Sequence, residues 1–138
     1  MITMDSSEVA ARIAGERAEK SRQHSQEEYV KAAVDYARAC GWVKEEQLPM
    51  LQERYLVPIY RKYLEIIQEV QAENPPASEF QESVRVLNFC LEATHRIGTT
   101  DSNNILLSVA AYRRQTRSEY ADYAVTAMQE FLCPLLAT

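Results

Sequence analysis

The sequence predicts an all-α protein, a compact antiparallel bundle of five or six helices whose central helix is kinked by a proline. Apolar residues recur at helical spacing through most of the chain, and no segment alternates with the period of two that is typical of a strand. The 138 residues include only three glycines and five prolines, which favours long elements joined by short turns. We expect a single domain over residues 1–138, with residues 1–24 as a loosely packed N-terminal arm, because the apolar side chains there are small.

The segment after this arm carries signals for the start and the end of a helix. Ser25–Glu28 has the pattern of a capping box, in which the serine and glutamate side chains satisfy backbone N–H groups that have no partner within the helix. Tyr29 and Tyr36 then share one helix face, and Gly41 is a typical helix stop. Trp42 follows, where a large apolar side chain is expected to close the end of a core.

Leu48–Val70 is expected to be the central element of the bundle. Two apolar stripes adjoin there at helical spacing and make an arc wide enough for contacts on several sides. Pro58 lies within the pattern and should kink or restart the helix, because it removes a backbone donor and clashes with the preceding turn. Asn74–Pro76 should end the helix near Glu73. The stripes consist of Leu51, Tyr55, Ile59, Tyr63, Ile66 and Val70, and of Leu56, Tyr60, Leu64 and Ile67.

The next helix should begin at a second capping box, Ser78–Gln81, and run to His95 or Ile97. Gly98 is placed to end it. Its apolar residues recur at steps of three and four, so they define one buried face. This predicted core line consists of Phe80, Val84, Leu87 and Leu91, with Cys90 and Thr94 beside it.

The C-terminal part of the chain contains one long helix or two shorter ones. Asp101–Asn104 supplies several candidate caps, and Thr116–Glu119 is a third capping box. The third box either starts a separate last helix or lies within one helix over residues 103–132. Pro134 should stop the final helix. Leu136 and its neighbour form an apolar end that should dock on the core.

Composition and charge narrow the class of protein. Hydrophobic residues make up 46% and charged residues 25% of the chain, as in an ordinary globular domain. The net charge of −5 argues against general nucleic-acid binding, which depends on neutralising phosphates. Cys40, Cys90 and Cys133 lack Cys-x-x-Cys spacing and are best explained as free thiols in a reducing compartment. No stretch has the character of a signal sequence or membrane span, so we expect a cytoplasmic protein without a membrane partner.

The two histidines are the candidates for metal or cofactor binding. Glu92 and His95 have the Glu-x-x-His spacing with which di-iron helical bundles hold metal. At about 100° per residue, however, Glu92 turns toward solvent, and the chain has no second motif of this kind. A haem-type site with His95 as ligand and Trp42 or Tyr63 as lining has no further support. We favour a boundary histidine near a helix C-terminus, a solvated His24, and no cofactor.

An arginine cluster precedes the last predicted helix. Arg113, Arg114 and Arg117 lie within five residues of one another, and Tyr120 and Tyr123 follow them. Such a cluster could hold a phosphate, an acidic protein surface or single-stranded RNA. The alternative is a solvated helix face whose arginines pair with the nearby carboxylates of residues 119 and 122. We favour this alternative over nucleic acid, and an acidic protein partner stays open.

The tyrosines are the main functional indication. The chain has eight tyrosines and three phenylalanines, whereas a core built for stability alone tends to prefer phenylalanine, because a buried hydroxyl needs a partner. Tyrosine is favoured at protein–protein interfaces, where one end of the ring is apolar and the other is wet. The candidate interface residues share helix faces in three groups: Tyr29 with Tyr36, Tyr55 with Tyr60 and Tyr63, and Tyr120 with Tyr123.

These observations favour a small cytoplasmic protein that acts through protein–protein contacts, as a regulator, inhibitor, immunity factor or assembly factor. A homodimer is expected, because wide apolar stripes leave faces to cover. Nothing in the chain marks an enzyme: no glycine-rich phosphate loop and no evident nucleophile with its base is found. The alternative is a helical domain that binds a ligand or cofactor in a cavity lined by His95, Trp42 or the tyrosines.

Overall fold

The computed structural model describes residues 21–41, 43–97 and 102–137, and no strand occurs among them. The prediction of an all-α protein is therefore confirmed for this part of the chain. Most of the predicted N-terminal arm (residues 1–20) and Trp42 lie outside the described residues. The long helices are α2 (Gln26–Cys40), α4 (Val57–Ala72), α5 (Ala77–Thr94), α6 (Ser102–Gln115) and α7 (Glu119–Leu136), with the short elements η1 (Glu45–Gln47), α3 (Leu48–Leu51) and η2 (Gln52–Leu56) between α2 and α4.

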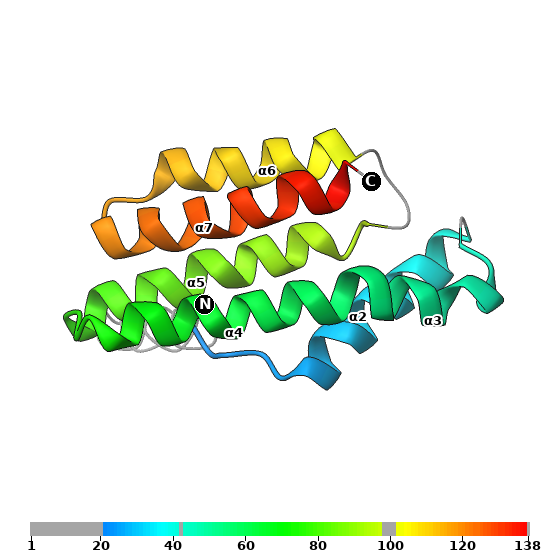
Figure 1. The fold of residues 1–138 in the computed structure, drawn as a ribbon, viewed down its shortest axis with the longest axis horizontal. Helices are drawn as coiled ribbons and strands as arrows, with labels where there is room; N and C mark the ends of the chain where they lie inside the picture. Colours follow the sequence, from blue (N-terminus) through cyan, green and yellow to red (C-terminus); the bar gives the residue numbers. More distant parts are fainter. Residues whose placement is uncertain (1–20, 42, 98–101, 138) are drawn as a thin grey trace, which may run out of the picture.

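The helices α4, α5, α6 and α7 lie side by side, and α2 packs on α4 and η2 (Figure 1). The most extensive contacts are between α5 and α7, each of which also packs against α4 and α6. The α4 helix contacts α2, α5 and α7, as its two apolar stripes require. The centre of the packing is thus the α5–α7 pair, and not the Leu48–Val70 element that the sequence predicted.

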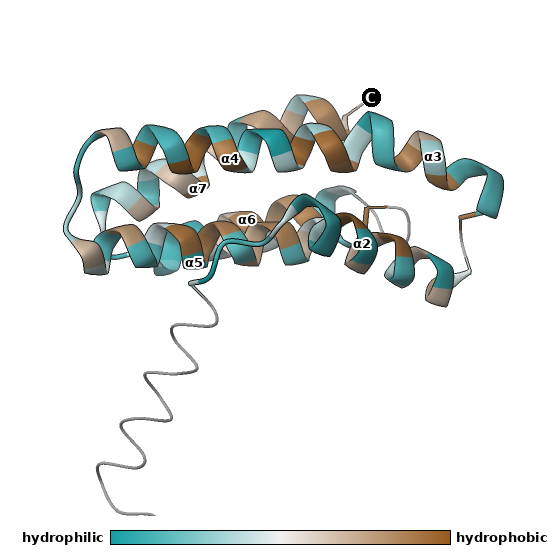
Figure 2. Cartoon of the chain, turned by 90° about the horizontal axis from the view of Figure 1, so that it is seen from below, coloured by the Kyte–Doolittle hydropathy of each residue, from teal (hydrophilic) through white to brown (hydrophobic). Residues whose placement is uncertain are grey.

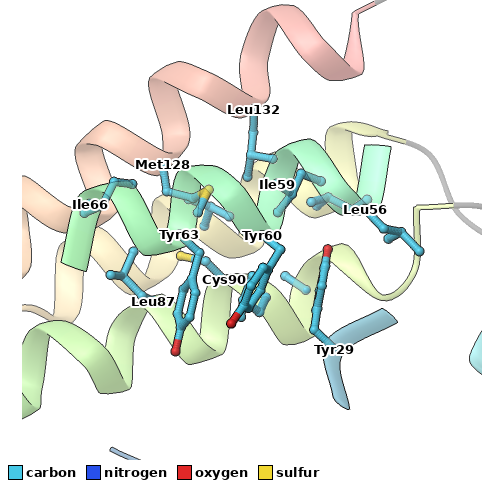
Figure 3. Packing of buried hydrophobic residues seen from close by; sticks show 14 of the residues in the cluster. Tyr29, Leu56, Ile59, Tyr60, Tyr63, Ile66, Leu87, Cys90, Met128 and Leu132 are labelled. Atoms are coloured by element: carbon cyan, nitrogen blue, oxygen red, sulfur yellow. The ribbon is translucent and has the colours of Figure 1, made fainter. Parts of the chain in front are cut away.

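One core runs through the whole set of helices. Hydrophobic and hydrophilic residues alternate along the helices, as expected where one face is turned toward a core (Figure 2). The core line predicted for α5 is buried except for Phe80, which is half-buried. Leu91 is among the largest fully buried side chains. Others are labelled in Figure 3: Leu56, Ile59, Tyr63, Ile66, Leu87, Met128 and Leu132.

A π-helical turn precedes Pro58, where the sequence predicts a kink or a restart of the helix. In η2 the chain forms a π-helix, and the Val57 N–H bonds to the carbonyl of Gln52, five residues earlier. Pro58 follows as one of the first two residues of α4. A π turn lets the helix continue past a residue that has no N–H and whose ring would crowd the preceding carbonyls. The helical path therefore runs from α3 through η2 into α4.

Several predicted helix ends are confirmed. The Ser25 hydroxyl accepts a hydrogen bond from the Glu28 N–H at 3.1 Å, which caps α2. Gly41 ends α2 in the left-handed conformation at φ 71°, with its N–H on the carbonyls of Ala37 and Arg38. Glu73 follows the last residue of α4, as predicted.

Two other predicted ends, the start of α5 and the end of α7, are wrong, and the choice that the sequence left open between one C-terminal helix and two is resolved. Ser78 does not cap α5, because the helix begins two residues earlier: Pro76 is its N-cap, and the Pro76 carbonyl accepts from the N–H groups of residues 79 and 80. Thr116 closes α6 by donating to the Arg113 carbonyl, and Ser118 caps α7 instead, so residues 103–132 form two helices. Pro134 lies inside α7, which continues to Leu136. A proline so near a helix end costs only one hydrogen bond, and burial of Leu136 offsets this loss.

Candidate functional site

Three of the predicted interface tyrosines belong to the core. Tyr29, Tyr60 and Tyr63 are 2%, 7% and 0% exposed, and their rings lie side by side between α2, α4 and α5 (Figure 3). The ring centroids of Tyr29 and Tyr60 are 6.2 Å apart, and those of Tyr60 and Tyr63 are 5.6 Å apart. Because these rings are covered by the chain's own helices, they do not form a surface for a protein partner.

The hydroxyl groups of these tyrosines bind the segment that leads into α2. Tyr63 donates to Asn88 Oδ1 at 2.7 Å and accepts from the His24 N–H at 3.3 Å. Tyr60 donates to the His24 carbonyl at 2.9 Å, and Asn88 Nδ2 donates to the Arg22 carbonyl at 2.8 Å. Burial raises the pKa of Tyr63 to about 12, so this hydroxyl keeps its proton at any physiological pH. The tyrosines therefore attach residues 22–24 to α4 and α5.

The third buried hydroxyl closes the contact between α2 and α5. Thr94 Oγ1 donates to the Leu91 carbonyl, so in the 2.7 Å contact between Tyr29 and Thr94 it is the tyrosine that donates. Burial also raises the pKa of Tyr29. Each of the three tyrosines satisfies its hydroxyl within the fold, which removes the main cost of burying tyrosine rather than phenylalanine.

Both histidines of the chain line one pocket between α2 and α5, with a volume of about 230 Å³. His24 Nδ1 lies 3.5 Å from Glu28 Oε2, and the Arg22 guanidinium holds the same carboxylate through two bonds of 3.2 and 2.9 Å. Hydrogen bonding to Arg22, with a smaller contribution from His24, lowers the pKa of Glu28 to about 2. The sequence predicted a solvated His24, and only the fold brings it close to His95.

His95, at the C-terminal end of α5, lines this pocket. Its ring centroid is 5.5 Å from that of Tyr29, and burial, with a smaller effect of the nearby His24, lowers its pKa. Glu92 is exposed, as its helical position predicted, although it borders the same pocket. Among the described residues, no three histidine, cysteine, aspartate or glutamate side chains lie close enough together to hold a metal ion.

The two predicted interface tyrosines on α7, Tyr120 and Tyr123, border an acidic groove between α4 and α7. Tyr123 is 49% exposed and Tyr120 is half-buried. A hollow of about 500 Å³ lies between them and the carboxylates of Glu69, Glu73 and Glu119. A second hollow of about 460 Å³ continues from Glu69 and Tyr123 along the same two helices, where it is lined by Lys62, Thr126, Glu130 and Phe131. We call these two hollows together the α4–α7 groove.

Charge is concentrated on one side of this groove. The Tyr123 hydroxyl donates to Glu69 Oε2 at 2.5 Å. This bond raises the pKa of Tyr123, and the nearby charges of Glu65 and Glu73 add to the effect. Lys62 is the one cationic residue that lines the groove among the described residues, and its ammonium lies 3.2 Å from Glu65. The α4 edge of the groove is therefore strongly negative.

The predicted arginine cluster lies on the opposite flank of α7. Arg113 Nε is 3.5 Å from Asp122 Oδ1, which confirms one of the two ion pairs that the sequence suggested. Arg114 donates to the Ala110 carbonyl, and the backbone N–H of Arg117 donates to Glu82. All three guanidinium groups belong to exposed residues, and within the described part of the chain no carboxylate lies within 4 Å of those of Arg114 and Arg117.

The last two predicted interface tyrosines lie at the other end of the molecule. Tyr36, on α2, is 41% exposed, and Tyr55, in η2, is half-buried beneath the Arg54 guanidinium at 5.4 Å. They do not share a groove with Tyr120 and Tyr123. The seven predicted interface tyrosines thus divide into three buried ones, two that border the α4–α7 groove, and two that lie away from it on α2 and η2.

None of the helices in the described part of the chain combines the length and the apolarity needed to cross a bilayer. Comparisons of the chain with protein-family models, with curated proteins and with solved structures each found no match.

Proposed function

We propose that this chain is a small cytoplasmic protein that acts through protein–protein contacts, as a regulator, inhibitor, immunity factor or assembly factor, and that it forms a homodimer. The observation that supports this proposal is the α4–α7 groove. It exposes Tyr123 between two helices, with Tyr120 and Phe131 half-buried beside it and carboxylates along its rim. Aromatic side chains enclosed by charged ones are the usual composition of a contact surface.

The proposal is tested by crosslinking from the groove. Tyr123 is replaced by a photoreactive benzophenone amino acid in the cells that make the protein, and the adducts are identified by mass spectrometry. The matched control places the same group at Met50, which is 53% exposed on α3 and does not line the groove. We expect protein adducts from position 123 and few from position 50. Equal labelling at both positions, or no protein adduct at all, would remove the support for a contact function.

The pocket between α2 and α5 favours a second candidate function, the binding of a small ligand. The supporting observation is that both histidines, Glu28 and Tyr29 face a single cavity of about 230 Å³. This volume is below the range of about 300–1,000 Å³ that is usual for ligand pockets, so a haem-sized group does not fit it as it stands. An absorption spectrum and the metal content of the purified protein test this candidate: a chromophore or stoichiometric metal that is lost in His95→Gln would favour it over the contact function.

A further inference from the structure

We propose that the outer face of α4, α7 and α6 binds a second copy of this chain, through a two-fold axis parallel to α7. The inference deepens the proposed contact function and rests on it, because it names the surface and the arrangement through which the proposed homodimer forms. It is based on the distribution of charge on this one face.

One edge of the face is acidic. Glu69 and Glu73 lie along the α4 side of the groove, and Glu119 lies beside them at the start of α7. Glu65, one turn before Glu69, adds its charge to the field at the Tyr123 hydroxyl. These carboxylates gather near the end of α4, close to where α7 begins.

The other edge is basic. Arg113 and Arg114 lie in the last turn of α6, and Arg117 follows in the turn that leads to α7. The end of α6 is thus joined by a short turn to the start of α7, and the end of α4 lies at the same end of the molecule (Figure 1). The acidic and the basic groups are therefore at the same height along the bundle.

The α7 helix separates the two edges. Asp122 pairs with Arg113 of α6, whereas the next residue, Tyr123, bonds to Glu69 of α4. Successive residues of an α-helix point about 100° apart, so α4 and α6 flank α7 on different sides. Across this face the order is acidic α4, then α7 with its exposed tyrosine, then basic α6.

Two copies that face each other across this surface can be related by a two-fold axis that lies in the plane of contact. An axis perpendicular to α7 that passes through the charged end of the bundle places the α4 of each copy on the α4 of the other, so that carboxylates meet carboxylates. An axis parallel to α7 places α4 on α6, so that Glu73 and Glu119 of each copy meet Arg114 and Arg117 of the other. A two-fold contact uses the same patch twice, and only the parallel axis makes this patch complementary to itself.

The net charge of the chain does not oppose this arrangement. Two chains of net charge −5 repel each other at long range, but at physiological ionic strength the Debye length is about 8 Å, so charges far from the contact are largely screened. Pairs at the contact are closer than this and are screened less. The dimer should therefore weaken as salt is added, while Tyr123, which is 49% exposed, supplies apolar surface on this face.

A charge-swap experiment tests the proposal on the full chain. One variant carries Arg114→Glu with Arg117→Glu, and the other carries Glu73→Lys with Glu119→Lys. Each variant alone places like charges opposite each other twice, so its dimer dissociation constant should rise about tenfold or more relative to the wild type. In a mixture the two variants restore opposite charges at both contacts. Native mass spectrometry should then show the mixed dimer as the main dimeric species.

Circular dichroism checks that each variant is folded. Glu46→Lys with Glu53→Lys is the control for the net charge of the lysine variant, because both residues are exposed and lie outside this face. This control should dimerise like the wild type. A wild-type chain that is monomeric by light scattering, swapped variants that dimerise like the wild type, or a mixture without mixed dimers would each overturn the proposal. If the crosslinks from position 123 then reach only other proteins, the contact function stands without the dimer. If no protein is crosslinked, both fail.

Discussion

Replacement of Tyr63 by phenylalanine is the sharpest test of what the buried tyrosines do. The substitution removes a single oxygen from a side chain that is 0% exposed and leaves its ring packing in place. That oxygen bonds to Asn88 Oδ1 at 2.7 Å and to the His24 N–H at 3.3 Å. If these bonds hold residues 22–24 on the bundle, Tyr63→Phe weakens both the fold and the attachment of that segment.

The magnitude follows from the partners that are left without a bond. Asn88 is 3% exposed, so its Oδ1 loses a partner that water does not readily replace, which costs about 1–3 kcal/mol. The second, longer bond joins a part-buried amide, where water replaces more of the loss. We expect unfolding to become easier by about 2 kcal/mol, which lowers the urea midpoint by about 1 M for a urea m-value of about 2 kcal/mol per M.

Urea denaturation followed by circular dichroism measures the loss, and hydrogen exchange of the His24 amide reports the local effect. Tyr36→Phe is the matched control, because Tyr36 is exposed and its removal should change stability by less than about 0.5 kcal/mol. A double-mutant cycle with Asn88→Ala should give a coupling energy of about 0.5–3 kcal/mol. If Tyr63→Phe unfolds at the wild-type midpoint and exchanges the His24 amide at the wild-type rate, the hydroxyl does not hold this segment.

Three further predictions concern single groups. Because burial raises the pKa of Cys90 to about 12, a thiol reagent should label Cys40 and Cys133 in the folded protein and Cys90 only after unfolding; three equally fast thiols would contradict the packing of α5. Gly41→Ala should cost about 1 kcal/mol in urea denaturation, since Gly41 has φ 71° and no atom near an added Cβ, and an unchanged midpoint would argue against the left-handed cap. The pKa of His95 is lowered in the folded protein, so burying the neutral ring contributes stability above its ordinary pKa of about 6.5, and this contribution is lost as the pH falls through the folded pKa. His95→Gln should therefore reduce the loss of stability between pH 7 and 5, measured by urea denaturation. An unaltered pH dependence would count against the burial of the ring.

The parts of the fold that the sequence predicts correctly are those with local causes. The Ser25 cap, the Gly41 stop and the end of α4 near Glu73 each depend on residues within one turn of the chain. The buried face of α5 also follows from periodicity alone, because Val84, Leu87 and Leu91 lie on one side of any regular helix. Prediction from local sequence fails where two signals compete. At the start of α5 both Pro76 and Ser78 could cap the helix, and at the end of α7 the break expected at Pro134 competes with burial of Leu136.

The candidate surfaces were only partly predictable, because periodicity assigns residues to a helix face but does not say which neighbour covers that face. Tyr63 and Tyr123 both lie on apolar stripes, yet one is enclosed by α5 and the segment before α2, while the other borders an open groove. The hydroxyl partner of Tyr63 is 25 residues away along the chain, and that of Tyr29 is 65 residues away. Partners so distant cannot be inferred from helical spacing.

Helicity, the two ends of α2, the end of α4 and the buried residues of α5 follow from the sequence, since these properties depend on neighbours three or four residues apart. The tertiary structure alone decided that α5 and α7 form the central pair, and that the arginines of α6 and the carboxylates of α4 flank the same helix. It also brought His24 and His95 into one pocket. The physical reason is that each of these features depends on which apolar faces meet when the chain folds, and many pairings of amphipathic helices satisfy the same local pattern.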